Sequence, residues 1–282
     1  MSSDRKIVKA YENSKYLGGE HARILRILSE YLEPESRMAE QKIKDTIVFF
    51  GSARIQPLEE SQRIFDELMK RLESGAEKPG EEEVNQASRA VRLSRYYEDA
   101  STLAQLIVPW ASALQGRGKR LVICSGGGPG IMEAANRGAK AAGGKSIGLS
   151  ISLPMEQSIN PYVPEELAFE FHYFFMRKLW FICMAKAVVI FPGGFGTLDE
   201  AFEALTLVQT GKTHGQMPIL FYGEDYWKDI LHFEALARWG MISPEDLKLI
   251  HFCDEPHQAF EIIKREIERI YGLDNESGYK VI

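Results

Sequence analysis

Three short apolar runs in this chain each end in a glycine turn, and this repeat constrains the fold more than any other feature. The runs and their turns are 46–50 with 51–54, 120–124 with 125–130, and 187–191 with 193–196. Apolar runs of about five residues that alternate with helices are typical of a parallel sheet covered on both faces. Such a sheet binds ligands at the carboxyl ends of its strands, where all three turns fall. The repeat therefore predicts an α/β fold with a ligand site at one edge.

The rest of the pattern divides the chain into an extension and one main unit. Residues 1–45 predict a helical N-terminal extension whose helix ends at Pro34, and 46–282 predict a single domain. The charge-dense segment 58–92 is interpreted as a helical insertion into that domain. Further helices are predicted at 94–114, 131–142, 176–184, 197–210, 226–237 and 257–271, and further strands at 146–150, 169–171 and 218–222.

Composition excludes several classes of protein. The net charge of -6 argues against a protein that tracks nucleic-acid phosphates, and no apolar run approaches the ~18 residues of a membrane span. The N-terminus lacks the apolar core of a secretory signal. Cys124, Cys183 and Cys253 each lie in an apolar context and are expected to be buried, reduced thiols of a cytoplasmic protein. The six histidines form no metal-binding pair, so we expect no metal and no cofactor.

The turn at 125–130 (Ser-Gly-Gly-Gly-Pro-Gly) only partly matches a dinucleotide-binding motif. Gly126 and Gly128 fit the first two glycines of G-x-G-x-x-G, but position 131 is Ile. The acid that would bind a ribose diol is missing after the next strand, which ends at Ser150. An NAD site is therefore disfavoured.

Two fragments imitate an ATP-binding P-loop. Gly144-Lys-Ser146 would need a glycine at position 139, which is Ala, and Gly211-Lys-Thr213 would need one at position 206, which is Thr. Both are interpreted as glycines that end helices.

The glycine turns then predict a cradle for one phosphate. Free N–H groups at 128–131 and 194–197 could converge on a monophosphate, because the first turn of a helix leaves its amides unpaired. The alternative is that both are simple strand-to-helix turns. Arg177 and Lys178 supply candidate cations among aromatic residues, and their alternative is a surface pair with buried stems.

Glu200 is the candidate reactive acid, and it has a plain structural alternative. The segment Thr197-Leu-Asp-Glu200 fits the S/T-x-x-E capping box, in which both side chains would only close the start of a helix. Asp199 could likewise only favour the helix dipole. Glu203 lies one turn further on and could share a face with Glu200. The sequence leaves capping and catalysis open.

Taken together, three motifs resemble the Lonely Guy family, long labelled as lysine decarboxylase-like. They are Ser125–Asn136, Met176–Lys178 and Pro192–Glu200, within a similarity that covers about residues 46–225. The resemblance implies a Rossmann-like, doubly wound sheet that binds nucleotides, and a homodimer or larger homo-oligomer. It also implies a nucleoside 5'-monophosphate phosphoribohydrolase, which releases a free base and ribose 5-phosphate.

The resemblance also implies roles for individual residues. Arg177 and Glu200 match the catalytic pair of the family. The remaining matches are the substrate-binding residues Gly126, Gly127, Gly128, Pro129, Gly130, Lys178, Gly193, Gly194, Phe195, Gly196, Thr197 and Asp199. Ser52, Arg54, Gln157 and Asn160 are further candidate substrate contacts. Gln157 and Asn160 lie where short members of the family have a substrate-contacting acid.

The mechanism hypothesis is hydrolysis through an oxocarbenium-like state. Glu200 would supply negative charge near C1' and orient a water, the glycine turns and Thr197 would hold the 5'-phosphate, and Arg177 would pin the phosphate or steady the leaving base. The substrate is expected to be AMP or a modified adenine nucleotide, with neither nucleic acid nor membrane as partner. The alternative is a protein that binds a nucleotide or a phosphorylated cofactor, such as the molybdenum cofactor, without turnover.

Overall fold

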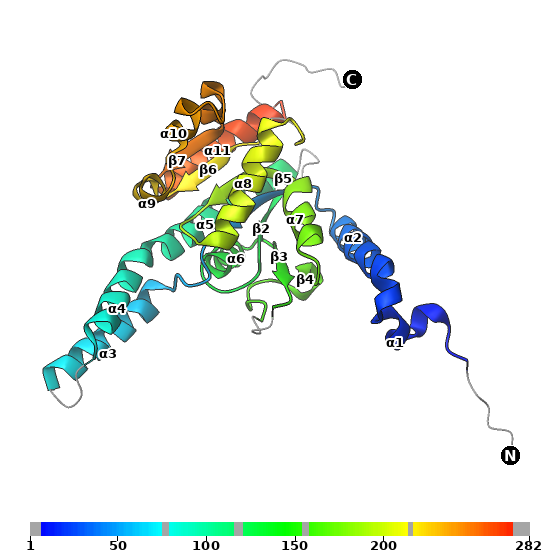
Figure 1. The fold of residues 1–282 in the computed structure, drawn as a ribbon, viewed down its shortest axis with the longest axis horizontal. Helices are drawn as coiled ribbons and strands as arrows, with labels where there is room; N and C mark the ends of the chain where they lie inside the picture. Colours follow the sequence, from blue (N-terminus) through cyan, green and yellow to red (C-terminus); the bar gives the residue numbers. More distant parts are fainter. Residues whose placement is uncertain (1–6, 75–78, 116–120, 154–157, 214–216, 273–282) are drawn as a thin grey trace.

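The computed structural model describes residues 7–74, 79–115, 121–153, 158–213 and 217–272, and within them one parallel sheet of seven strands forms the centre (Figure 1). The strands are β1 (Asp45–Phe50), β2 (Leu121–Ser125), β3 (Ser146–Ile151), β4 (Ala168–Phe171), β5 (Ala185–Ile190), β6 (Ile219–Tyr222) and β7 (Ile250–Cys253). Their order is β4-β3-β2-β1-β5-β6-β7, and every neighbouring pair is parallel. The predicted α/β fold is confirmed.

The strand order reverses beside β1. The chain builds β2, β3 and β4 on one side of β1 and then returns to place β5 on the other side. In an open α/β sheet, ligands bind at the carboxyl ends of the strands where the order reverses. The expected crevice therefore lies above the ends of β1 and β5.

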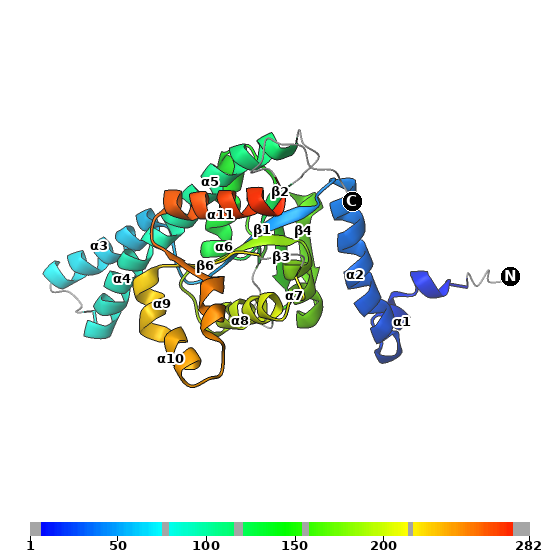
Figure 2. The same cartoon turned by 90° about the horizontal axis from the view of Figure 1, so that it is seen from above.

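Helices cover both faces of the sheet, as Figure 2 shows edge-on. One face carries α5 (Arg95–Gln115), α6 (Ile131–Ala141) and α11 (Pro256–Ile270), and the other carries α7 (Phe174–Cys183), α8 (Phe195–Gln209), α9 (Glu224–Ile230) and α10 (Phe233–Arg238). Side chains of β1 alternate between the two faces. Ile47 and Phe49 join one buried apolar cluster, and Val48 and Phe50 join the other.

The N-terminal region is helical, but Pro34 does not end its helix. Short turns η1 (Ala10–Glu12), α1 (Ser14–Leu17) and η2 (Glu20–Ala22) precede α2 (Arg23–Glu40), which contains Pro34. A proline deprives the carbonyl four residues earlier of its helical donor. Here that carbonyl belongs to Glu30, and the Trp180 Nε1 donates to it at 3.0 Å. The indole replaces the missing bond and ties α2 to α7.

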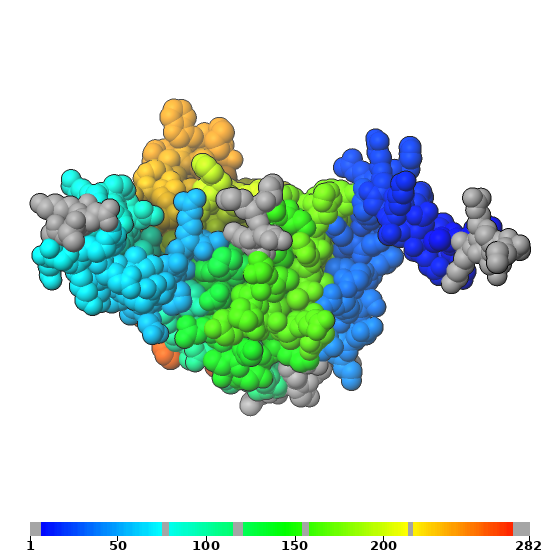
Figure 3. Space-filling view, turned by 90° about the horizontal axis from the view of Figure 1, so that it is seen from below, coloured from blue at the N-terminus to red at the C-terminus, as the bar shows by residue number. Residues whose placement is uncertain are grey.

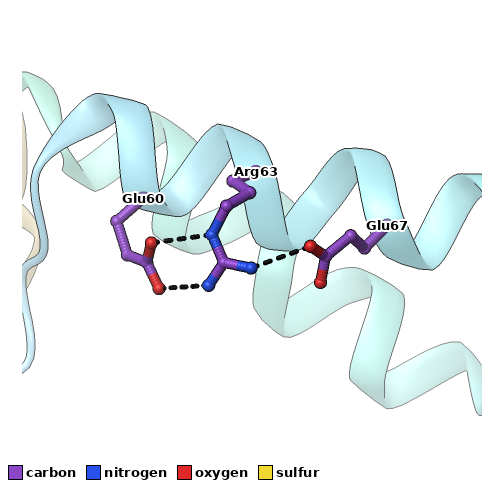
Figure 4. A network of polar contacts seen from close by, with 3 residues as sticks. All are labelled: Glu60, Arg63 and Glu67. Carbon is purple, nitrogen blue, oxygen red and sulfur yellow. Dashed lines mark hydrogen bonds and ion pairs between the residues drawn. The ribbon is translucent and has the colours of Figure 1, made fainter.

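The charged segment forms two helices, α3 (Leu58–Ser74) and α4 (Glu81–Leu93), which project together away from the sheet (Figures 1 and 3). The exposed Arg63 of α3 lies between two glutamates of its own helix, 2.6 Å from Glu60 and 2.8 Å from Glu67 (Figure 4). Pairs three and four residues apart stabilise a solvated helix by a few tenths of a kcal/mol each, roughly.

Other features were not predicted. Strand β7, the short helices η3 (Glu165–Leu167) and η4 (Pro244–Leu249), and the division of the helical region near 226–237 into α9 and α10 were not expected. Cys124 and Cys253 are buried as predicted, but Cys183 is exposed because it lies at the last position of α7. Within the described residues, none of the helices combines the length and hydropathy needed to cross a membrane.

Candidate active site

The three glycine turns are hydrogen-bonded to one another. The Ser52 N–H, just after β1, donates to the Pro192 carbonyl after β5 at 3.0 Å. The Ile131 N–H at the start of α6 donates to the Ser52 carbonyl at 3.1 Å. Because β1 lies between β2 and β5, its turn joins the other two. The Ile131 amide is therefore occupied, and the prediction that it faces a phosphate is wrong.

The turn at 126–130 has a backbone that glycine permits and buried side chains that hold it. Gly127 and Gly130 have φ angles of 70° and 71°, which favour glycine. The buried Asn160 side chain donates to the carbonyls of Gly127 at 2.9 Å and Gly128 at 3.1 Å. It also reaches Asn136, which accepts from the Ser125 hydroxyl. The Asn160 side chain therefore stabilises this turn by hydrogen bonds to its backbone.

The glycine turn at 193–196 leads into α8 without a side chain that caps the helix. Gly194 is the N-cap of α8 and no side chain caps the helix, so the amides of residues 195–197 have no partner within the helix. A Cβ atom built on Gly194 or Gly196 would meet nothing within 4 Å. Tyr226 fixes the turn from behind, because its hydroxyl donates to the Gly193 carbonyl at 2.8 Å. An anion can approach these amides from the open side.

The capping box, which the sequence left open as an alternative, does not form. Helix α8 begins at Phe195, so Thr197 lies inside the first turn and Glu200 lies a turn further along. The Thr197 side chain instead packs against Gly193, where a Cβ would overlap it. The interpretation of Glu200 as a helix cap is therefore wrong for this helix.

Glu200 is a buried carboxyl group with an unpaired oxygen. Its residue is only 7% exposed, and its Oε2 atom has no hydrogen-bond partner among the described residues. Burial raises the pKa of Glu200 to about 7, against the opposing effect of Arg177 and Lys178 and with a further rise from Glu203 and Asp199. A buried carboxyl group that titrates near neutral pH is characteristic of functional sites.

Arg177, on α7, lines the same pocket as Glu200, on α8. Its Nε donates to the Leu149 carbonyl at the end of β3 at 2.8 Å, and its guanidinium lies 5.0 Å from the centre of the Phe181 ring. Burial lowers the pKa of Arg177, and the charge of Glu200 partly opposes this effect. The guanidinium also approaches Gly126, where a Cβ would lie 2.6 Å from Nη2. A side chain at 126 would displace the end of Arg177 and that of Met132, whose Sδ would also lie 2.6 Å from the Cβ.

Lys178 points elsewhere, although it follows Arg177 directly. Its ammonium lies 2.8 Å from the Asp199 carboxylate and 3.1 Å from that of Glu203, both on α8. It does not line the pocket that Arg177 and Glu200 share. Lys178 therefore binds Asp199, which lines the pocket, but its own side chain is not part of the lining.

These elements enclose a cavity of about 270 Å³ at the point where the strand order reverses. It is lined by Phe50, Gly51, Ser52, Ala53, Arg54, Gly126, Met132, Phe174, Arg177, Phe181, Gly194, Gly196, Thr197, Asp199 and Glu200. The polar groups converge from the turns, whereas Phe50, Met132, Phe174 and Phe181 form an apolar wall. Sequence reasoning missed this wall; the only signal was the aromatic pair just before Arg177.

The other predicted contacts lie outside this lining. Among the described residues, these are Gly127, Gly128, Pro129, Gly130, Asn160, Lys178, Gly193 and Phe195. Phe195 is 92% exposed at the start of α8. Gln157 lies outside the described residues. In the part of the chain that the structure describes, no group of three or more His, Cys, Asp or Glu side chains could hold a metal ion.

Comparison with known proteins identifies the family. A family model described as "possible lysine decarboxylase" matches residues 132–263. A cytokinin riboside 5'-monophosphate phosphoribohydrolase of Mycobacterium tuberculosis is 30% identical over 164 residues, which cover 56% of this chain and 83% of that relative. The chain belongs to the Lonely Guy family. The named relatives of this family are phosphoribohydrolases, which are hydrolases that act on N-glycosyl bonds.

Two further proteins are similar to this chain, one in sequence and one in structure. A "probable" cytokinin riboside 5'-monophosphate phosphoribohydrolase of rice (Oryza sativa subsp. japonica) is 28% identical over 186 residues, covering 64% of this chain and 86% of the relative. Among solved structures, the molybdenum cofactor binding protein of Rippkaea orientalis is 20% identical, with a TM-score of 0.44 over 79% of this chain and 98% of that protein.

Proposed function

We propose that this Lonely Guy protein hydrolyses the N-glycosidic bond of nucleoside 5'-monophosphates, giving a free base and ribose 5-phosphate. The observation that carries the proposal is the buried, unpaired Oε2 of Glu200 in the pocket that Arg177 and the open start of α8 share. A protein that only binds phosphate gains nothing from a carboxylate at this position, because it repels the anion. The names of the relatives support the same reaction.

The pocket offers a place for each part of the substrate. The 5'-phosphate binds the amides of residues 195–197, with Arg54 at the same rim. The apolar wall of Phe50, Met132, Phe174 and Phe181 accepts the base. A pocket with one apolar wall and a few convergent polar groups is typical of small-molecule sites.

Glu200 then acts at the sugar. As the C1'–N bond breaks, positive charge develops at C1', and a nearby carboxylate stabilises it. Glu200 in its ionised form accepts a proton from the water whose oxygen bonds to C1', and the base leaves with the electron pair of the broken bond. Arg177 interacts with the phosphate or with the departing base and favours the ionised form of Glu200.

The test is base release from a panel of nucleoside 5'-monophosphates, beginning with AMP and N6-modified adenine nucleotides, followed by chromatography. We expect activity on at least one nucleotide and a loss of about 100-fold or more in kcat for Glu200→Gln and Arg177→Ala. The matched control is Glu166→Gln, an exposed carboxylate 2.6 Å from Lys145, which should keep full activity. Nucleotide binding without any base release would favour the alternative, a non-catalytic carrier of nucleotides or phosphorylated cofactors.

A further inference from the structure

Lys178 connects the two helices that carry the proposed catalytic groups. It lies on α7 beside Arg177, and its ammonium is 2.8 Å from Asp199 and 3.1 Å from Glu203 on α8. Those two carboxylates are four residues apart, so they share one face of α8. The side chains of Lys178 and Glu203 are 19% and 30% exposed, whereas that of Asp199 is 58% exposed, so solvent screens the pair with Asp199 more than the pair with Glu203. These two ion pairs link α7 to the face of α8 that carries Asp199 and Glu203.

The same three side chains also set the charge around Glu200. The charged groups that face Glu200 from the packed elements are Arg177 and Lys178 on α7, Asp199 and Glu203 on α8, and Arg54 in the turn after β1. Burial raises the pKa of Glu200 most strongly; Arg177 and Lys178 lower it, and Glu203 and Asp199 raise it. Removing the ammonium would remove one attraction and leave two repulsive carboxylates without their partner.

We propose that Lys178 is a positioning residue for Glu200: by binding Asp199 and Glu203 it fixes α8 against α7 and determines the pH range in which the site is active. The proposal rests on the proposed function, in which the ionised form of Glu200 is the active one. It differs from the role of phosphate ligand that the sequence suggested. Two cations adjacent in the chain thus have separate tasks, since neighbouring helical residues point about 100° apart.

The positioning role of Lys178 predicts that the acidic limb of the kcat/KM profile shifts in opposite directions in two variants. In Lys178→Met, Glu200 keeps its proton to higher pH, so the acidic limb of the kcat/KM profile moves up by about one pH unit. At pH values below this limb, kcat/KM falls roughly tenfold, and alkaline pH restores most of it. In Glu203→Gln one repulsive charge is lost while Lys178 still binds Asp199, so the limb moves to lower pH. Lys178→Arg keeps a cation and should keep a limb near that of the native protein.

The experiment measures kcat and KM from pH 5 to pH 9.5 for these three variants and the native protein. A second readout needs no substrate: the side-chain ¹³C carboxyl signal of Glu200, assigned by its absence in Glu200→Gln, is titrated in each protein. Thermal unfolding checks that each variant is folded, and Lys178→Arg and Glu203→Gln keep the test valid if Lys178→Met does not fold.

The outcomes separate the two proposals. Upward shifts of both the kinetic limb and the Glu200 signal in Lys178→Met support the positioning role. An unshifted limb with a raised KM and weaker inhibition by ribose 5-phosphate would overturn it and make Lys178 a phosphate ligand. If the native protein releases no base from any nucleotide, the proposed function fails, but the carboxyl titration still tests the action of Lys178 on Glu200.

Discussion

Replacing Glu200 with glutamine should stabilise the protein while it abolishes turnover. The carboxyl group is buried, and burial raises its pKa to about 7 in the folded chain. In the unfolded chain the same group returns to its ordinary value of 4.5. Glutamine has nearly the same shape and carries no charge, so it removes the cost of ionising this buried site.

The magnitude and sign follow from these two values. The difference, 7 minus 4.5, is about 2.5 pH units, and at about 1.36 kcal/mol per unit this is roughly 3 kcal/mol. Between pH 4.5 and 7 the unfolded chain releases a proton that the folded chain keeps, so stability falls as pH rises. Above pH 7 the full cost is present. Glu200→Gln lacks this cost, so its advantage should be small at pH 4.5 and reach roughly 3 kcal/mol by pH 8.

The assay is thermal unfolding of both proteins at intervals from pH 4.5 to pH 9. At roughly 2 °C per kcal/mol for a chain of this size, the variant should unfold about 6 °C higher at pH 8 and at almost the same temperature at pH 4.5. Glu166→Gln is the contrasting control, because its hydrogen bond with Lys145 lowers the pKa of Glu166 and the replacement should give no gain. Parallel curves for native protein and Glu200→Gln would refute the reasoning.

Three further substitutions test the support of the site. Gly126→Ala places a Cβ 2.6 Å from Arg177 Nη2, and the displaced guanidinium should lower kcat by roughly tenfold or more in the base-release assay, with the fold intact in circular dichroism. Asn160→Ala leaves the buried Gly128 carbonyl without its side-chain donor, while the Gly127 carbonyl keeps the N–H of residue 160, and this should cost about 1 kcal/mol of unfolding free energy in thermal denaturation. Trp180→Phe removes the donor to the Glu30 carbonyl and should cost about 1 kcal/mol, with faster amide hydrogen exchange in α2.

The fold could be predicted where the sequence carries a local signal. Strands such as β1 and β5 contain continuous apolar runs, 47–50 and 187–190, which are typical of buried parallel strands. Strand β7 (Ile-His-Phe-Cys) lies at the edge of the sheet, and its pattern is only four residues long and is interrupted by His251. The continuation of α2 past Pro34 could not be predicted, because it depends on Trp180, a residue far away in the chain.

The site could be predicted in its parts but not in the direction of each side chain. The turns, Arg177 and Glu200 were expected to share one pocket; Arg177, Glu200 and residues from each turn line the same cavity, whereas 127–130 and Gly193 lie outside its lining. Lys178 and Asn160 were expected to join them, but one pairs with α8 and the other supports a turn from below. Both are polar residues close in sequence to the site, and only three-dimensional packing decides which acceptors they meet.

Glu200 shows why a local pattern cannot separate a cap from a reactive group. Thr197-Leu-Asp-Glu200 is a good capping box only if the helix begins just after Thr197. The preceding glycines allow it to begin at Phe195 instead, which moves Glu200 from the end of the helix to its buried side. There its Oε2 atom has no hydrogen-bond partner among the described residues, and burial raises the pKa of Glu200 against the opposing effect of Arg177 and Lys178. Because α8 starts at Phe195, two residues upstream of Thr197, Glu200 is a buried carboxyl group with a raised pKa and not a helix-capping residue. The difference in unfolding free energy between the native protein and Glu200→Gln measures the cost of ionising this group.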